Sequence, residues 1–95
     1  MNDANFTKIY NMLNMCFDCA GIEAGQAIKP VIKKSPAGIS YYVDLCIEEY
    51  DEEQLAYFVG FLTEQIGFKN IWFDTYPKSG RVNFEIIVPL ETLAR

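Results

Sequence analysis

The sequence contains one motif with known chemical uses, the CxxC segment Cys16-Phe17-Asp18-Cys19. Redox CxxC motifs stand where a strand runs into the N-terminus of a helix, because the helix dipole stabilises the thiolate there. Here the apolar spacing places the motif at the C-terminal end of a helix, beside the negative charge of Asp18, and both features disfavour a thiolate. We therefore expect Cys16 to be a core residue and the motif to have no redox role.

Neither a metal site nor acid–base catalysis is favoured by the remaining residues. A zinc site needs four ligands, and beyond the CxxC motif the chain offers Cys46 and carboxylates but no His. Asp44, Asp74 and Glu85 could act as catalytic carboxylates only inside a cleft that gives them different environments. We expect solvated strand charges instead, and hence no metal, no cofactor and no enzymatic activity.

Length and charge narrow the class of protein. The 95 residues fit a single domain, 1–95, because a second domain would leave only about 50 residues for each core. Eight Lys and Arg stand against 13 Asp and Glu, which gives a net charge of −5. That balance disfavours nucleic acids and anionic membranes as direct partners.

The cysteine content and the N-terminus indicate a compartment. Three cysteines are an odd number at low density, which predicts free thiols in a reducing environment. No stretch reaches the roughly 18 apolar residues of a membrane helix, and residues 1–5 lack the start of a secretory signal. We expect a cytoplasmic protein.

Helical periodicity appears in two segments. Apolar residues recur at helical spacing over 6–20 and again over 52–66. Asp51 and Gln54 have the spacing of a capping box at the start of the second helix. Gly60 lies in the middle of that helix, where glycine is less favourable than alanine. Close packing against a neighbour would explain a glycine at this position, and so would an ordinary imperfection.

Two long segments, 39–48 and 81–90, alternate apolar and polar residues with the period of half-buried strands. Each is preceded by a turn that contains proline and ends in glycine, which predicts a hairpin. The segments before the turns, 27–34 and 69–76, are therefore expected to be the partner strands.

The resulting order is αββαββ, which predicts an α+β two-layer sandwich. It is the order obtained when the first strand of a ferredoxin-like βαββαβ fold is moved to the end. The sheet would be antiparallel and four-stranded, with 39–48 and 81–90 central, 27–34 and 69–76 at the edges, and both helices on one face. Pro30 fits an edge strand because proline cannot donate to a ladder.

If the aliphatic positions face the helices, the other face of the sheet is open. The central strands would contribute Ser40, Tyr42, Asp44, Cys46, Glu48, Arg81, Asn83, Glu85 and Ile87, and the edges Lys29, Val31, Lys33, Trp72, Asp74 and Tyr76. Aromatic residues of this kind are enriched in binding hot spots. An open aromatic sheet is also typical of RNA-recognition modules, but the acidic charges on this face disfavour RNA. A set of scattered surface aromatics is the remaining interpretation.

The segment 48–53 is the strongest charge feature, with five acids in six residues. Helix capping accounts for much of it, because Glu52 and Glu53 fall in the first turn, where the helix dipole favours anions. An acidic knob could also occupy a basic groove on a partner.

These features together favour a non-enzymatic acidic module that binds another protein. Inhibitors, immunity proteins and phage-encoded antagonists of a basic, nucleic-acid-handling target have this size and charge. The expected partner-binding residues are Tyr42, Asp44, Trp72, Asp74, Tyr76, Glu85, Glu52 and Glu53. The alternative is a homodimeric ferredoxin-like regulatory module that binds a small ligand at the dimer seam.

Overall fold

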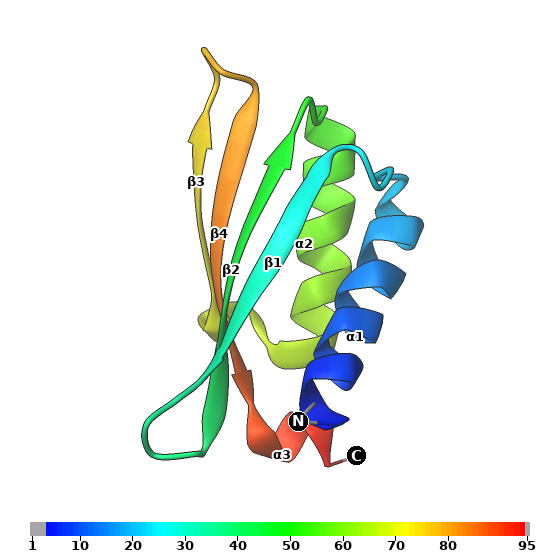
Figure 1. Cartoon of the computed structure of the whole chain (residues 1–95). Coiled ribbons are helices and arrows are strands. Elements are labelled where there is room, and N and C mark those ends of the chain that lie inside the picture. Colours follow the sequence, from blue (N-terminus) through cyan, green and yellow to red (C-terminus); the bar gives the residue numbers. More distant parts are fainter. Residues whose placement is uncertain (1–3, 95) are drawn as a thin grey trace.

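The computed structural model describes residues 4–94 and has two layers, a four-stranded antiparallel sheet and a layer of helices on one side of it (Figure 1). In chain order the elements are α1 (Ala4–Ala20), β1 (Ala27–Lys34), β2 (Ser40–Glu48), α2 (Glu52–Ile66), the 3-10 turn η1 (Phe68–Asn70), β3 (Ile71–Tyr76), β4 (Arg81–Pro89) and α3 (Leu90–Leu93). The strand order β1-β2-β4-β3 confirms the predicted α+β sandwich with its central and edge strands. The relation to a permuted ferredoxin-like fold stays an interpretation of that order.

The N-terminal cap of α2 is the one that the sequence predicts. The Gln54 N–H donates to Asp51 Oδ1 (2.7 Å), and the Asp51 N–H donates to Gln54 Oε1 (3.1 Å), which completes the capping box. Gly67 ends the helix at a φ of +86°. Within residues 4–94, no helix is long and apolar enough to cross a membrane.

Gly60 is exposed on α2, and a Cβ built on it would meet no atom within 4 Å. The interpretation that close packing requires this glycine is therefore wrong. α1 begins at Ala4, two residues before Phe6, the first apolar residue of the periodic stretch 6–20.

The core lies between the sheet and the helices. The Phe58 ring stacks on Phe17 with centroids 5.1 Å apart, and it meets the edge of Phe84 at the same distance. Cys16 of the CxxC motif is fully buried, as predicted for a core residue. These contacts fix both long helices on the same face of the sheet.

The ends of the strands differ from the prediction at three places. Ile39 lies outside β2 and is 70% exposed, although its carbonyl still accepts a hydrogen bond from the Leu90 N–H (2.9 Å). Leu90 starts α3, which follows Pro89 and brings Leu93 against the core. Lys69 belongs to η1 rather than to β3.

The register of β1 shifts between Ile28 and Val31, so that Lys29 and Pro30 lie in a β-bulge. The predicted edge position of Pro30 is confirmed. The bulge brings Ile28 opposite Cys46, and this adds an apolar side chain to the open face that the simple alternation of strand residues had not placed there.

Candidate functional site

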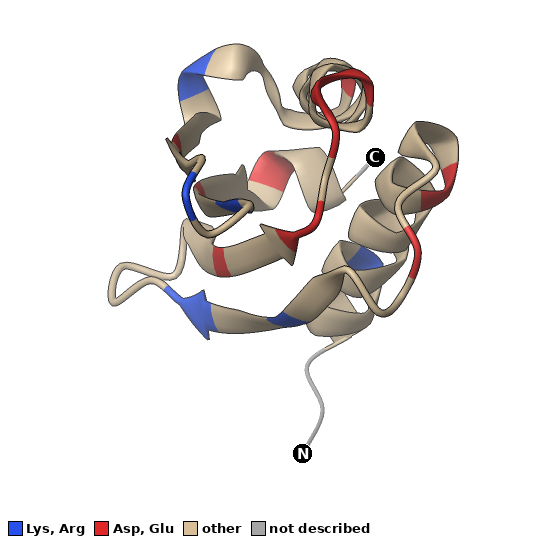
Figure 2. Cartoon of the chain, turned by 90° about the horizontal axis from the view of Figure 1, so that it is seen from above, with Lys and Arg blue, Asp and Glu red and all other residues tan. Residues whose placement is uncertain are grey.

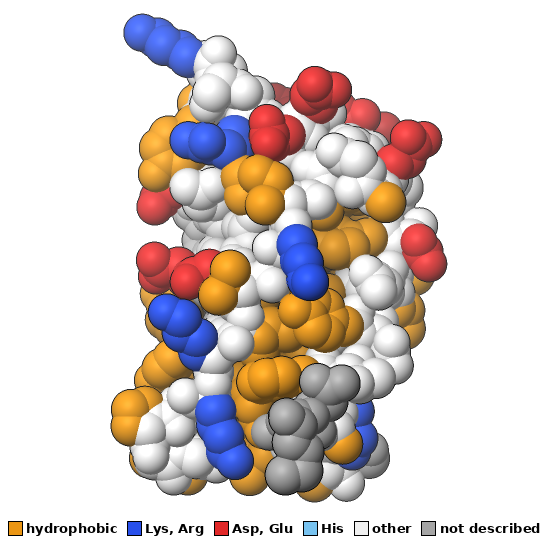
Figure 3. Space-filling view, viewed as in Figure 1, with side chains coloured by type: hydrophobic (Ala, Val, Ile, Leu, Met, Phe, Trp, Pro, Cys, Tyr) orange, Lys and Arg blue, Asp and Glu red, His pale blue; other side chains and the backbone are white. Residues whose placement is uncertain are grey.

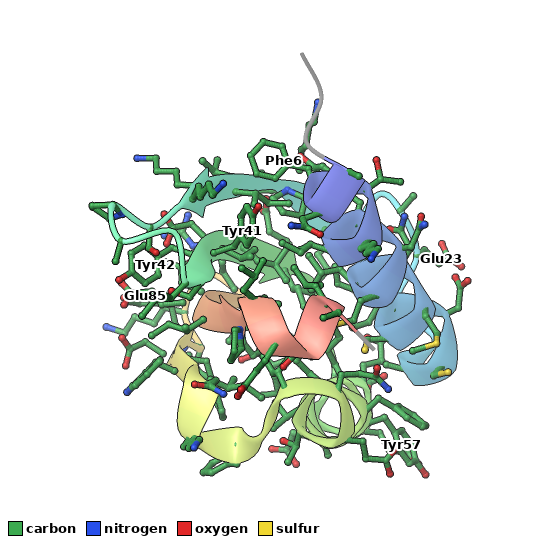
Figure 4. The ribbon with its side chains drawn as sticks, turned by 90° about the horizontal axis from the view of Figure 1, so that it is seen from below. Phe6, Glu23, Tyr41, Tyr42, Tyr57 and Glu85 are labelled. Atoms are coloured by element: carbon green, nitrogen blue, oxygen red, sulfur yellow. The ribbon has the colours of Figure 1, made fainter. Side chains whose placement is uncertain are left out.

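The register decides which side chains share the open face, because directly opposed residues in antiparallel strands lie on the same side. Across the sheet, Tyr42 pairs with Ile87, Trp72 with Glu85 and Tyr76 with Arg81. The three aromatic residues therefore project together away from the helices, as the alternation predicts. Figure 4 shows Tyr42 and Glu85 pointing away from the helix layer, whereas Tyr41 points into it.

Two acids lie opposite each other at the centre of this face, Asp44 on β2 and Glu85 on β4. We call them the acidic pair. The register row that contains them continues to Val31 on β1 and Trp72 on β3, so it holds no Lys or Arg.

The backbone geometry brings the acidic pair close together. The Glu49 N–H donates to Gly80 O (2.8 Å), and the Leu90 N–H donates to Ile39 O (2.9 Å). Backbone groups alternate sides along a strand, so odd-numbered residues of β2 bond to even-numbered residues of β4. The acidic pair has the opposite parity and is a non-hydrogen-bonded pair, in which the Cα atoms approach to about 4.5 Å and the side chains are closest.

The acidic pair lies in a hollow of about 490 Å³ on the open face. The hollow is lined by Lys33, Tyr42, Val43, Asp44, Trp72, Glu85, Ile86 and Ile87. Trp72 and Tyr42 are 51% and 47% exposed, so both rings offer free apolar area beside the carboxylates. An arrangement of this kind can hold a cation by charge and by its rings at the same time.

The rest of the open face carries a different balance of charge. Asp74 is paired with Asn83. The Arg81 guanidinium lies 5.7 Å from the centroid of the Tyr76 ring, within the range of a cation–π contact. Tyr76 is therefore already in contact with a cation of its own chain, whereas Trp72 is next to a carboxylate.

Glu52 and Glu53 do not share the open face with the other predicted residues. They are exposed in the first turn of α2, which belongs to the helix layer. Figure 2 shows the acidic groups at the end of β2 and at the start of α2 in separate layers. The predicted binding residues thus form two separate surfaces.

Two of the three thiols, Cys16 and Cys46, have a raised pKa, which disfavours the thiolate. Burial raises the pKa of Cys16 to about 11, and nearby Cys19 and Glu64 add to the effect. Burial also raises the pKa of Cys46, against the opposing effect of Arg81. Among residues 4–94, no group of three or more His, Cys, Asp or Glu could hold a metal ion.

One apolar residue of the face, Ile28, was missed by reasoning from the sequence. It lines a second hollow with Val31 and Cys46. The available signal was Pro30, since a proline inside a strand marks either an edge or a bulge. A bulge shifts the alternation by one residue and so changes which side chains face outward.

The chain was also compared with known proteins. No family model, no curated protein and no solved structure matches it.

Proposed function

We propose that this chain is a non-enzymatic protein-binding module whose open sheet face covers a basic surface of another protein. The acidic pair, Asp44 and Glu85, is the observation that supports this most directly. Like charges opposite each other on neighbouring strands destabilise a sheet by about 0.2–1 kcal/mol. A cationic side chain of a partner, placed in the hollow, would convert this repulsion into attraction.

The aromatic residues support the same proposal. Trp72 and Tyr42 border the acidic pair and are about half exposed. Such rings bury a large area at low entropic cost and dominate many protein interfaces. In the proposed complex they supply the apolar contact, and the carboxylates steer the partner and fix its register.

The class that fits these features is an inhibitor, immunity protein or phage-encoded antagonist that acts by occlusion in the cytoplasm. A basic, nucleic-acid-handling protein is a suitable target because its own surface is complementary to carboxylates. Self-association through the open face has less support, since it would bring the acidic pairs of two copies together.

The test is recovery of a partner from the native host by the tagged chain, followed by measurement of the affinity for that partner at several salt concentrations. We compare wild type with Trp72→Ala/Tyr42→Ala and with Asp44→Asn/Glu85→Gln. The matched controls are Tyr57→Ala and Glu64→Gln, which remove an exposed aromatic ring and an exposed acid from α2.

We expect both open-face variants to weaken binding by at least about tenfold, and the acid variant to flatten the salt dependence. The two controls should bind like wild type. Equal binding by the open-face variants and the controls would refute the proposal. A Glu52→Lys/Glu53→Lys variant tests the start of α2 separately, since that surface lies in the other layer.

A further inference from the structure

The two edges of the sheet differ in how they are protected against pairing with another strand. The edge strand β1 contains Pro30, a β-bulge and three lysines, Lys29, Lys33 and Lys34. In Figure 3, lysine or arginine side chains follow the course of β1. Proline, bulges and lysines are the devices that prevent edge-to-edge association.

The opposite edge, β3, has none of these devices. Its sequence, IWFDTY, contains one charge, no Pro and no Lys, and it pairs with β4 without a register shift. All its residues after Ile71 are exposed, including Phe73. Aromatic and β-branched residues of this kind favour strand pairing.

The backbone groups on the free edge of β3 can be identified from the ladder. Even-numbered residues of β4 bond to β2, as the bond from Glu49 to Gly80 shows, so the odd-numbered ones bond to β3. Trp72, Asp74 and Tyr76 therefore direct their backbone groups at β4. The backbone N–H and C=O groups of Phe73 and Thr75 therefore point away from β4, toward the free edge of the sheet.

The carbonyl of Ile71 points to the same free edge. Its N–H is already used, because it donates to Phe68 O in the 3-10 turn. The free edge therefore presents the N–H and C=O groups of Phe73 and Thr75, together with the C=O of Ile71.

We propose that β3 pairs antiparallel with β3 of a second copy of this chain, so that the two sheets join into one. In the register centred on Phe73, each Phe73 exchanges N–H and C=O bonds with Phe73 of the second copy. Each Thr75 N–H donates to the Ile71 carbonyl of the other copy. A two-fold axis makes this interface self-complementary.

Charge disfavours one neighbouring register, and hydrogen bonding disfavours the other. Shifting the centre to Asp74 would set the two Asp74 carboxylates opposite each other as a close non-hydrogen-bonded pair. Shifting it to Trp72 would leave the outward groups of Thr75 opposite the 3-10 turn. In the register centred on Phe73, Trp72 lies opposite Asp74 of the second copy.

The charges around β3 also make this edge suitable for contact with a second copy. The chain as a whole has a net charge of −5. Residues 68–81, in contrast, carry Lys69, Lys78 and Arg81 against a single acid, Asp74. A contact between two copies at this edge therefore brings only one carboxylate from each copy into the interface. The open faces of both copies remain on the same side of the joined sheet, free for another partner.

The first test is the mass in solution by light scattering between about 1 and 100 µM. Wild type should shift from 10.9 kDa toward twice that mass. Thr75→Pro removes the outward N–H without removing a bond to β4, and should raise the dissociation constant at least about tenfold. Thr75→Val keeps the N–H and should behave like wild type. A wild type that is monomeric throughout, or a Thr75→Pro that dimerises equally well, would overturn the proposal.

The second test reports the register and does not depend on Thr75. Trp72→Cys and Asp74→Cys are each made in a Cys19→Ser/Cys46→Ser background. Each variant is oxidised by itself, and an equal mixture of the two is oxidised as a third sample. The proposed register crosslinks only the mixture, since Cα atoms of facing residues lie within disulfide range. Crosslinking of Asp74→Cys by itself, of Trp72→Cys by itself, or of no sample would contradict it.

Discussion

The side-chain amides of Gln26 and Gln54 hydrogen-bond to each other, with Nε2–Oε1 distances of 3.2 and 3.4 Å. Gln26 Nε2 also donates to Glu49 O (3.1 Å), and Gln54 Nε2 donates to Gly21 O (2.8 Å). Gln54 is at the same time the capping-box residue of α2. The pair thus joins the end of α1, the start of β1, the end of β2 and the start of α2.

Gln54→Ala should lower the free energy of unfolding by about 1–3 kcal/mol, because it removes the capping box and leaves a carbonyl and an amide without their partner. Urea unfolding measures this. Gln65→Ala, near the other end of the same helix, should change stability by less than about 0.5 kcal/mol. Equal effects of the two substitutions would show that the glutamine pair does not stabilise the fold.

Glu85→Gln should raise the free energy of unfolding by about 0.2–1 kcal/mol, because it removes the repulsion within the acidic pair. The gain should be largest at low ionic strength and should shrink as salt screens the charges. Thermal unfolding at two salt concentrations measures both effects. Glu64→Gln removes an acid from the surface of α2 and should show a smaller gain; a loss of stability in Glu85→Gln would contradict the prediction.

Gly60→Ala should stabilise the chain by about 0.5–1 kcal/mol, because alanine favours a helix interior. A Cβ at this position meets nothing within 4 Å, so no clash offsets the gain. Gly67→Ala serves as the contrast, since its φ of +86° strains any residue with a Cβ and stability should fall. Unfolding of both variants in urea provides the comparison, and a destabilised Gly60→Ala would disprove the argument.

The Cys16 thiol should make stability fall at alkaline pH. Its pKa is raised from 9.0 to about 11, chiefly by burial. Its contribution to stability is therefore complete below about pH 9 and is lost as the pH rises toward 11, by about 3 kcal/mol in all.

Cys16→Ala isolates this effect, because the variant has no thiol to titrate while all other groups remain. The difference in unfolding free energy between wild type and Cys16→Ala should shrink between pH 8 and pH 11. A difference that stays constant over this range would mean that burial does not raise the pKa of the Cys16 thiol.

The amino-acid sequence was enough to predict the two long helices, the four strands and the faces that they present. The capping box of Asp51 and Gln54 and the helix-ending Gly67 are local features, because each involves residues only a few positions apart. The alternation along 39–48 and 81–90 likewise predicted which side chains turn away from the helices, since strand side chains alternate strictly in regular stretches. The positions of Tyr42, Trp72 and Tyr76 on one face follow from this rule.

The residues of different strands that lie opposite each other could not be predicted in this way, because they depend on long-range packing. The position of Asp44 opposite Glu85 depends on the register between two strands that are separated in the chain by a whole helix and a third strand. A shift of two residues would keep every side chain on its face but would separate the two acids. The bulge that exposes Ile28, and the layer that separates Glu52 from the sheet face, depend on the same long-range packing. The local sequence pattern fixes the side of a strand on which a side chain lies. The register of the strands and the layer to which a residue belongs come from the one arrangement that buries the apolar faces of the helices and the sheet together.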